Sequence, residues 1–187
     1  MHNIFEESIH ILQTLRRDSA FAAKLRDASA MMTAALEAGN KILWCGNGGS
    51  AADCQHLSAE LVAQLSRPRR ALASLALTTD TSYLTARVND EGNAGDIFSR
   101  QIEALAKPGD ILVAVSTSGN SPNILRALEK AKEHGVRSIL FGGNGGGKAR
   151  GKADLELIVP SRNTQRIQEA HIMIGHIICE HIETAFV

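Results

Sequence analysis

The sequence has little that would mark it as secreted, membrane-bound or nucleic-acid-binding. It contains three cysteines, an odd number, and no C-x-x-C pair, which argues against a disulfide scaffold and fits reduced thiols. Lys plus Arg equals Asp plus Glu at 20 each, so no basic excess exists to bind a phosphate backbone. The first 18 residues lack the apolar core of a signal peptide, and no apolar run approaches the length of a membrane span. We therefore expect a cytoplasmic protein with neither nucleic acid nor a membrane as partner.

What is present is typical of one globular domain. The 187 residues are 44% hydrophobic and 21% charged, enough for one core. Apolar strands alternate with helical patterns, which is typical of a parallel sheet covered by helices on both faces. We predict a single α/β domain over 1–187, a three-layer αβα sandwich with a five-stranded parallel sheet and long terminal helices. The expected strands are 41–45, 71–77, 111–115, 136–141 and 155–159; the expected helices are 4–37 (broken near Asp18), 50–65, 97–106, 122–134 and 164–185, with a turn at 89–92.

A glycine-rich turn, residues 46–50, follows the first expected strand. Its glycines let backbone N–H groups approach an oxygen-rich ligand, and we expect Ser50 to cap the next helix. The string also fits the dinucleotide fingerprint G-x-G-x-x-G/A, which needs an acidic residue near the end of the second strand. Thr78 and Thr79 stand there and Asp80 comes late, so this interpretation is weak. From this segment alone, a plain turn and an anion-binding loop fit equally well.

A second polar loop, residues 116–121 (STSGNS), follows the third expected strand. It carries four hydroxyls in six residues, just before a helix that begins at Pro122. Hydroxyls and N–H groups at a helix start can hold a phosphate without Lys or Arg. Helix capping and turns use the same residue types, but one serine would suffice for them. The density of hydroxyls therefore favours a phosphate loop.

Two helices carry groups able to bind metal or transfer protons. His56 and Glu60 share one helical face at i and i+4, a spacing that suits zinc or an acid–base pair, although most such pairs are solvated surface contacts. Gln168 and His176, eight residues apart, differ by about 80° around the last helix and can reach a common site. His176 lies in an apolar stretch, where a lone histidine is more often a core residue.

Three further residues of the last helix have a structural interpretation. We interpret His171 and His181 as structural or surface residues. Glycine inside a helix costs roughly 1 kcal/mol relative to alanine, so Gly175 indicates close packing against another element.

In this order the motifs resemble the sugar isomerase (SIS) domain family, and within it the sedoheptulose 7-phosphate isomerases. The resemblance covers nearly the whole chain and implies a five-stranded parallel sheet. It also implies a homotetramer with active sites near subunit interfaces, in which the helical segment 1–38 packs. The matching segments are CGNGGSAADCQHLSAEL (45–61), LTTDTSYLTA (77–86), Asn89–Asp90, FSRQIEAL (98–105), GDILVAVSTSGNSPNIL (109–125) and VPSRNTQRIQEAHIMIGHIICEHIE (159–183).

The resemblance implies an activity and a site. The activity is conversion of sedoheptulose 7-phosphate to D-glycero-D-manno-heptose 7-phosphate, for bacterial heptose-containing glycans such as lipopolysaccharide or capsule. It implies Glu60 as base, His176 as acid, and one Zn2+ per subunit held by His56, Glu60, Gln168 and His176. Substrate contacts are implied at Asn47, Gly48, Gly49, Ser50, Glu60, Asn89, Asp90, Ser116, Thr117, Ser118, Ser121 and Gln168.

Two positions depart from the family pattern. Arg87 and Val88 stand before Asn89, where relatives usually have small or aliphatic residues, and Gly142 stands where relatives often carry threonine. Neither departure removes a residue assigned to chemistry.

Three other functions remain as alternatives. The first is a non-catalytic SIS-domain protein that binds the replication initiator; such relatives lack counterparts of Glu60 and His176. The second is a zinc hydrolase, although the chain lacks the second histidine of H-E-x-x-H. The third is a nicotinamide dehydrogenase, already weakened by the missing ribose-binding acid.

Overall fold

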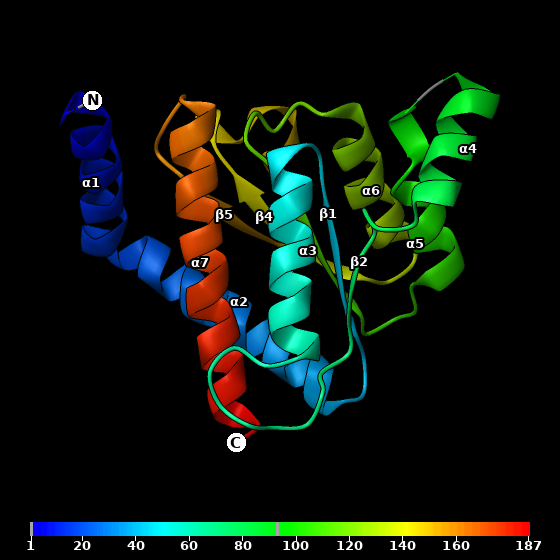
Figure 1. Ribbon diagram of the computed structural model, residues 1–187, viewed down its shortest axis with the longest axis horizontal. Coiled ribbons are helices and arrows are strands. Elements are labelled where there is room, and N and C mark those ends of the chain that lie inside the picture. The colour runs from blue at the N-terminus through cyan, green and yellow to red at the C-terminus, as the bar shows by residue number, and fades with distance from the viewer. Residues whose placement is uncertain (1, 93) are drawn as a thin grey trace.

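The computed structural model describes residues 2–92 and 94–187 and has an α/β fold built on one parallel sheet (Figure 1). The five strands lie in the order β2-β1-β3-β4-β5, and all neighbours are parallel. The chain order therefore reverses between β1 and β3, the place where open parallel sheets bind ligands beyond their carboxyl ends. The strands are β1 Ile42–Gly46, β2 Ser74–Ala76, β3 Ile111–Ser116, β4 Arg137–Gly142 and β5 Leu155–Ile158.

Helices cover both faces of the sheet, as the three-layer prediction requires. The α-helices are α1 His2–Arg17, α2 Ser19–Glu37, α3 Gly49–Val62, α4 Thr81–Glu91, α5 Ser99–Leu105, α6 Pro122–Glu133 and α7 Thr164–Ala185, and two short 3-10 helices are η1 Ala94–Asp96 and η2 Asn144–Ala149. In Figure 1, α7 and α3 stand side by side on one face, and α2 runs beneath them. No helix of the described residues is both long and apolar enough to cross a membrane.

The alternation of side chains along each strand creates two cores. Ile42 and Trp44 of β1 point into the core shared with α2, α3 and α7. Leu43 and Cys45 point into the opposite core, shared with α5 and α6. All four side chains are fully buried, which explains why β1 is apolar along its whole length.

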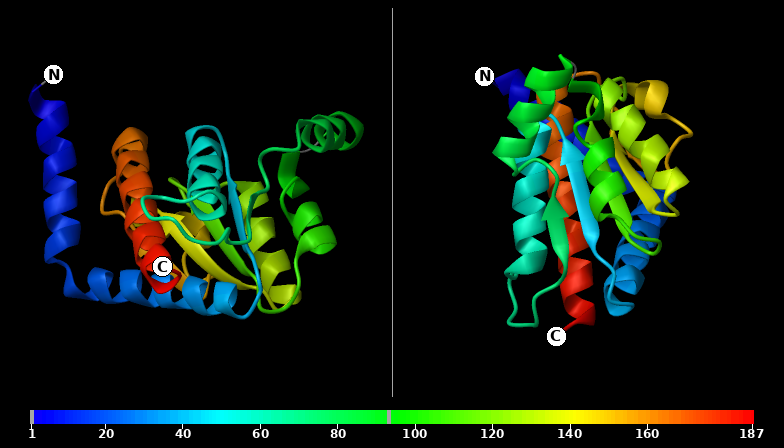
Figure 2. Two further views of the ribbon diagram at one scale, coloured as in Figure 1. Left: turned by 60° about the horizontal axis from the view of Figure 1, so that its bottom comes forward. Right: turned by 90° about the vertical axis from the view of Figure 1, so that its right-hand side faces the viewer.

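The break predicted near Asp18 is present. The Asp18 carboxylate accepts hydrogen bonds from the backbone N–H of Ala20 and Phe21 and so caps α2. The chain bends sharply at this point (Figure 2), and α1 lies beside α7, where Ser8 Oγ donates to the Glu169 carboxylate. The Asp18 cap therefore marks the bend at which α1 ends and α2 begins.

Three predicted boundaries were wrong. β2 begins at residue 74, not 71, because the Leu72 N–H donates to the Leu61 carbonyl and draws the preceding chain away from the sheet. α3 ends at residue 62, not 65, because the next N–H groups turn to another partner, the Glu183 carboxylate. The turn expected at 89–92 is the last turn of α4, which ends at Gly92 in the left-handed conformation (φ +60°).

Close contact between α3 and α7 positions the candidate site. A Cβ added to Gly175 would lie 2.3 Å from Leu57 Cδ1, which confirms the close packing predicted there. Further along the pair, the Glu183 carboxylate of α7 accepts hydrogen bonds from the backbone of Leu65, Ser66 and Arg67, just beyond α3. These contacts, one near the middle and one at the end, hold the two helices together along their length.

Candidate active site and metal centre

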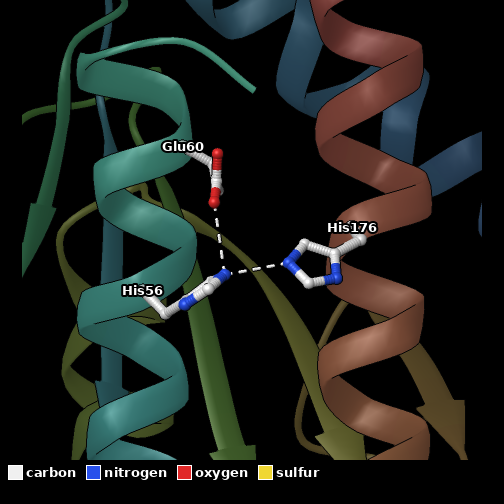
Figure 3. Close-up of side chains that lie close together, drawn as sticks. All are labelled: His56, Glu60 and His176. Atoms are coloured by element: carbon white, nitrogen blue, oxygen red, sulfur yellow. Dashed lines mark hydrogen bonds and ion pairs between the residues drawn. The ribbon is translucent and has the colours of Figure 1, made fainter. Parts of the chain in front are cut away.

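Two imidazoles and one carboxylate meet between α3 and α7 (Figure 3). His56 Nε2 lies 2.9 Å from His176 Nε2 and 3.2 Å from Glu60 Oε1. The two rings meet edge to face with their centroids 5.0 Å apart. The His56 side chain is 50% exposed and that of Glu60 21% exposed, so the cluster opens to solvent. The structure thus brings together residues 120 positions apart, as the convergence of the two helices requires.

The donor set of this cluster fits a zinc ion. One ligand atom from each of His56, Glu60 and His176 lies within 4.8 Å of the others. Zinc binds His nitrogen and carboxylate oxygen at about 2.0–2.1 Å in a tetrahedron, which sets ligand atoms roughly 3.3 Å apart. The observed separations of 2.9 and 3.2 Å are close to that spacing. Three protein ligands with one side open to solvent is the arrangement typical of catalytic zinc sites.

Gln168 precedes His176 on α7 by eight residues, which is about two helical turns, in the direction of the start of α3. Its side-chain amide packs on Gly49, where an added Cβ would lie only 2.7 Å from Gln168 Nε2. Three of the four predicted metal ligands therefore cluster, whereas Gln168 lies between them and the glycine turn on the same pair of helices.

The glycine turn begins α3 with backbone groups. Gly48 is the N-cap residue, with a φ of +55° that favours glycine. The Ser50 N–H donates to the Asn47 carbonyl, and the Ala51 N–H donates to the Gly48 carbonyl. Ser50 is buried inside the helix, so its predicted role as the cap was wrong. The cap needs no side chain here, because glycine and the turn carbonyls close the helix start.

Two asparagines form a reciprocal pair between the glycine turn and α6. Asn47 Nδ2 donates to Asn123 Oδ1 at 2.9 Å, and Asn123 Nδ2 donates to Asn47 Oδ1 at 2.8 Å. A pocket of about 310 Å³ lies beside them and is lined by Asn47, Ala94, Gly95, Ser121, Pro122 and Asn123. Sequence reasoning assigned Asn47 and Ser121 to substrate but missed Asn123, which follows Pro122 and gave no signal beyond that of a helix start.

In the hydroxyl loop, two serines stabilise the turn, whereas the hydroxyl of a third makes no capping hydrogen bond. Ser116 Oγ accepts from the Gly119 N–H and Ser118 Oγ accepts from the Asn120 N–H, so these two serines do stabilise the turn. Ser121 is the N-cap of α6, yet its side chain makes no capping hydrogen bond. The Ser121 hydroxyl therefore remains available at the edge of the pocket.

The glycine-rich segment after β4 packs directly on this loop. The Ala149 N–H donates to the Gly119 carbonyl at 2.9 Å, and the Lys148 N–H donates to Asn120 Oδ1 at 3.0 Å. A Cβ on Gly119 would lie 1.9 Å from the Gly146 carbonyl oxygen. The glycines thus allow two backbones to touch, and the segment fixes the shape of the hydroxyl loop.

Asn89 and Asp90 lie away from the cluster within this chain. Both are exposed in the last turn of α4, where Asn89 Nδ2 donates to Asp90 Oδ1 at 3.0 Å. Figure 1 places α4 at the opposite side of the domain from α7. The structure therefore does not bring these two predicted substrate contacts to the His56 cluster of the same chain.

Both departures from the family pattern have local partners. The Arg87 guanidinium pairs with the Asp96 carboxylate, and Nε donates to Oδ1 at 3.1 Å. Hydrogen bonding to Arg87 lowers the pKa of Asp96. At Gly142, an added Cβ would lie 2.6 Å from Ile158 Cδ1, so Ile158 fills the space that a larger residue would need.

Two further ionisable groups lie on the cluster helices: Asp53 of α3, which is partly buried, and His171 of α7, which is buried. Burial raises the pKa of Asp53, one turn before His56, and its Oδ2 has no hydrogen-bond partner among the described residues. His171 donates from Nε2 to the Gly142 carbonyl at 3.0 Å, because a carbonyl can only accept. Burial lowers the pKa of His171 to about 4, so the ring is neutral and its role is structural, as predicted.

Comparison with known proteins identifies close relatives. The family model for the SIS domain matches residues 5–143. A phosphoheptose isomerase of Aquifex aeolicus is 49% identical over 180 residues, covering 96% of this chain and 93% of the relative. The solved structure of a phosphoheptose isomerase from Francisella tularensis has a TM-score of 0.93 at 36% identity, covering 98% of this chain and 96% of that one. That from Neisseria gonorrhoeae has a TM-score of 0.89 at 40% identity, with the same coverage.

Proposed function

The chain belongs to the SIS-domain family, among the phosphoheptose isomerases, and from this premise we propose how its residues perform the reaction. It converts sedoheptulose 7-phosphate to D-glycero-D-manno-heptose 7-phosphate in the biosynthesis of heptose-containing glycans. The observation that carries the residue assignments is the meeting of His56, Glu60 and His176 between α3 and α7. The relatives named above are isomerases, which favours an enzyme over an initiator-binding protein.

The reaction moves a proton between C1 and C2 of the sugar through an enediol. Glu60 is the proposed base that removes and returns this proton, because a partly exposed carboxylate beside the two imidazoles can reach a carbon-bound proton of a bound sugar. His176 is the proposed acid that moves a proton between the two sugar oxygens. His176 Nε2 forms a hydrogen bond with His56 Nε2, so one proton lies between the two rings. The sugar oxygens would bind beside this proton.

His56, Glu60 and His176 are the residues that would hold Zn2+, one ion per subunit, with Gln168 as the proposed fourth ligand. When bound, the ion would act as a Lewis acid at the sugar carbonyl. A carboxylate that ligates a metal is a weaker base, and an imidazole that ligates one has fewer protons to give. Glu60 and His176 therefore cannot fill both roles fully at one instant, and the variants Glu60→Gln and His176→Ala distinguish the roles through turnover and zinc content.

The phosphate and the sugar chain have proposed contacts along the carboxyl edge of the sheet. The Thr117 and Ser121 hydroxyls and the start of α6 would hold the phosphate, while Asn47 and Gly48 would contact the sugar. Gln168, which packs on Gly49, lies between this edge and the catalytic cluster. Binding energy from the distant phosphate would position the reacting carbons. Asn89 and Asp90 would contact substrate only if supplied by another subunit.

The direct test is turnover of sedoheptulose 7-phosphate, followed as loss of ketose, by the wild type with and without added zinc. We expect turnover, and a loss of at least about 100-fold in Glu60→Gln and His176→Ala. Gln64→Ala is the matched control, because Gln64 is exposed and lies four positions after Glu60, just beyond the end of α3. Near-normal turnover in either site variant, with zinc retained, would overturn the acid–base assignment. Capture of a replication initiator without turnover would instead support the non-catalytic alternative.

We also propose a homotetramer in which α1 packs against other subunits. Phe5 is 70% exposed, and Ile4, Ile9 and Met173 are also exposed, an unusual density of apolar surface. A groove of about 530 Å³ beside them is lined mainly by apolar residues of α1, α2 and α7. Sedimentation of the wild type and of Phe5→Asp tests this: we expect a tetramer that dissociates in the variant. A monomeric wild type would refute the proposal.

The cytoplasm is the proposed location. The three cysteines are free and buried, and burial raises the pKa of Cys179 to about 12, which keeps its thiol protonated and inert. Cell fractionation followed by immunodetection tests the location, and recovery in the periplasmic fraction would contradict it.

A further inference from the structure

We propose that Asn123 is a positioning residue that holds the Asn47 amide at the substrate pocket, so that the two side chains bind the sugar as one unit. The inference rests on the proposed function, because it takes the pocket beside the pair to hold part of the sugar phosphate. Asn123 is on α6, directly after the hydroxyl loop, and its partner lies 76 positions earlier in the glycine turn. The pair therefore ties the proposed phosphate loop to the proposed sugar loop.

The hydrogen-bond capacity of the two amides leaves groups free for a ligand. A primary amide has two N–H donors and an oxygen with two lone pairs. The reciprocal bonds of 2.9 and 2.8 Å use one N–H and one lone pair of each side chain. One donor and one acceptor therefore remain on Asn47, and the two reciprocal bonds restrict the directions in which they point. A sugar hydroxyl, which both donates and accepts, matches such a donor–acceptor edge.

Because Asn123 is buried, its side-chain amide depends strongly on the hydrogen bonds with Asn47. Asn123 is 7% exposed, and a buried amide without partners costs the full desolvation of its polar atoms. The pairing thus stabilises a single orientation of each amide rather than several. Without Asn123, the Asn47 side chain would rotate about its own bonds, and part of its ordering would have to occur when substrate binds.

The test is a double-mutant cycle on KM and kcat with Asn47→Ala and Asn123→Ala. We expect each single substitution to raise KM about tenfold, which corresponds to about 1.4 kcal/mol, with kcat changed by less than about threefold. If Asn123 acts through Asn47, then Asn123→Ala adds less than about twofold once Asn47 is already alanine. Additive effects, about 100-fold in the double variant, would overturn the proposal.

A second variant separates hydrogen bonding from packing. Asn123→Asp keeps the size of the side chain and can accept from Asn47, but its carboxylate cannot donate to the Asn47 oxygen. We expect the same loss of affinity as in Asn123→Ala. A KM like that of the wild type in Asn123→Asp would show that the hydrogen bond donated by Asn123 is not needed to hold the Asn47 amide, and would refute the positioning role.

The matched control is Gln101→Ala. Gln101 is another buried amide, which donates to the Leu77 and Ile97 carbonyls and touches neither asparagine. It is expected to lower the thermal midpoint as Asn123→Ala does, with KM unchanged. A raised KM in this control would show that KM merely follows stability and would count against the proposal. An inactive wild type would refute the proposed function itself, which makes the two failures distinguishable.

Discussion

Replacing Gly175 with alanine is expected to weaken both the fold and the proposed metal centre. The added Cβ would lie 2.3 Å from Leu57 Cδ1 and 2.6 Å from Leu57 Cδ2. Leu57 is only 1% exposed, so its methyl groups have no open space to enter. Either Leu57 adopts a strained rotamer or α3 and α7 move apart. His56 directly precedes Leu57 and His176 directly follows Gly175, so the ring nitrogens of both histidines move with the helices.

Two opposing effects set the size of the change. Alanine inside a helix gains about 1 kcal/mol over glycine, whereas overpacking a core costs about 1–3 kcal/mol. We therefore expect the free energy of unfolding to fall by about 1 kcal/mol, or roughly 2–4 °C in the thermal midpoint of a chain of this size. Changes in the support of metal ligands typically lower metal affinity about 10–100-fold, and we expect a loss of zinc affinity in that range.

The assay combines urea unfolding of the zinc-free protein, at a fixed protein concentration, with zinc competition against a chromophoric chelator. Glu180→Ala is the matched control because Glu180 lies on the same helix but is exposed. Leu57→Ala in the Gly175→Ala background is expected to recover part of the zinc affinity by removing the clash. A Gly175→Ala protein that is more stable than the wild type and binds zinc equally well would refute this reasoning.

Three further predictions concern other contacts. Burial lowers the pKa of His171 from 6.5 in the unfolded chain to about 4 in the folded protein, so the unfolded state binds more protons and the free energy of unfolding falls by about 1.4 kcal/mol per pH unit between pH 6.5 and 4. His171→Gln is expected to weaken this pH dependence, which unfolding measured at several pH values in that range would show. Burial alone would raise the pKa of Glu183, but the hydrogen bonds from the backbone outweigh burial and lower the pKa. The stability that the Glu183 carboxylate contributes is therefore complete above pH 4.5 and is lost as pH falls through the pKa of the folded protein. Glu183→Ala is expected to lower the free energy of unfolding by about 3 kcal/mol at neutral pH, measured by urea unfolding. Gly119→Ala is expected to raise KM for the sugar phosphate about tenfold or more, because the added Cβ distorts the hydroxyl loop. The control is Gly151→Ala, which has a similar positive φ but no atom close to the added Cβ; it adds backbone strain and is expected to leave KM unchanged in the same kinetic assay.

The sheet was predictable because burial on both faces leaves a direct pattern. Apolar strands bounded by glycine and proline predicted all five strands to within a few residues. The errors arose where side chains distant in sequence decide the boundary. Glu183 captures the N–H groups of residues 65–67 and ends α3 early, and no local pattern indicates this. The Asn89–Gly92 string has the composition of a turn, yet its first three residues continue α4 up to the glycine that ends it.

The candidate site was predictable only in part. The i, i+4 spacing of His56 and Glu60 indicates a shared face, but the meeting with His176 depends on how α7 packs, which the family resemblance implied and periodicity could not. Asn123 was missed because an asparagine at a helix start ordinarily serves its own turn. Its true partner, Asn47, is on another element, and a single sequence does not reveal such pairs.

The division of the proposed metal ligands between α3 and α7 has a consequence for how the protein is made. His56 and Glu60 leave the ribosome long before His176, which follows His56 by 120 positions. A nascent or truncated polypeptide that stops before α7 carries His56 and Glu60 but not His176, however well its sheet has formed. Tight zinc uptake would therefore report that α7 has been synthesised and has docked against α3.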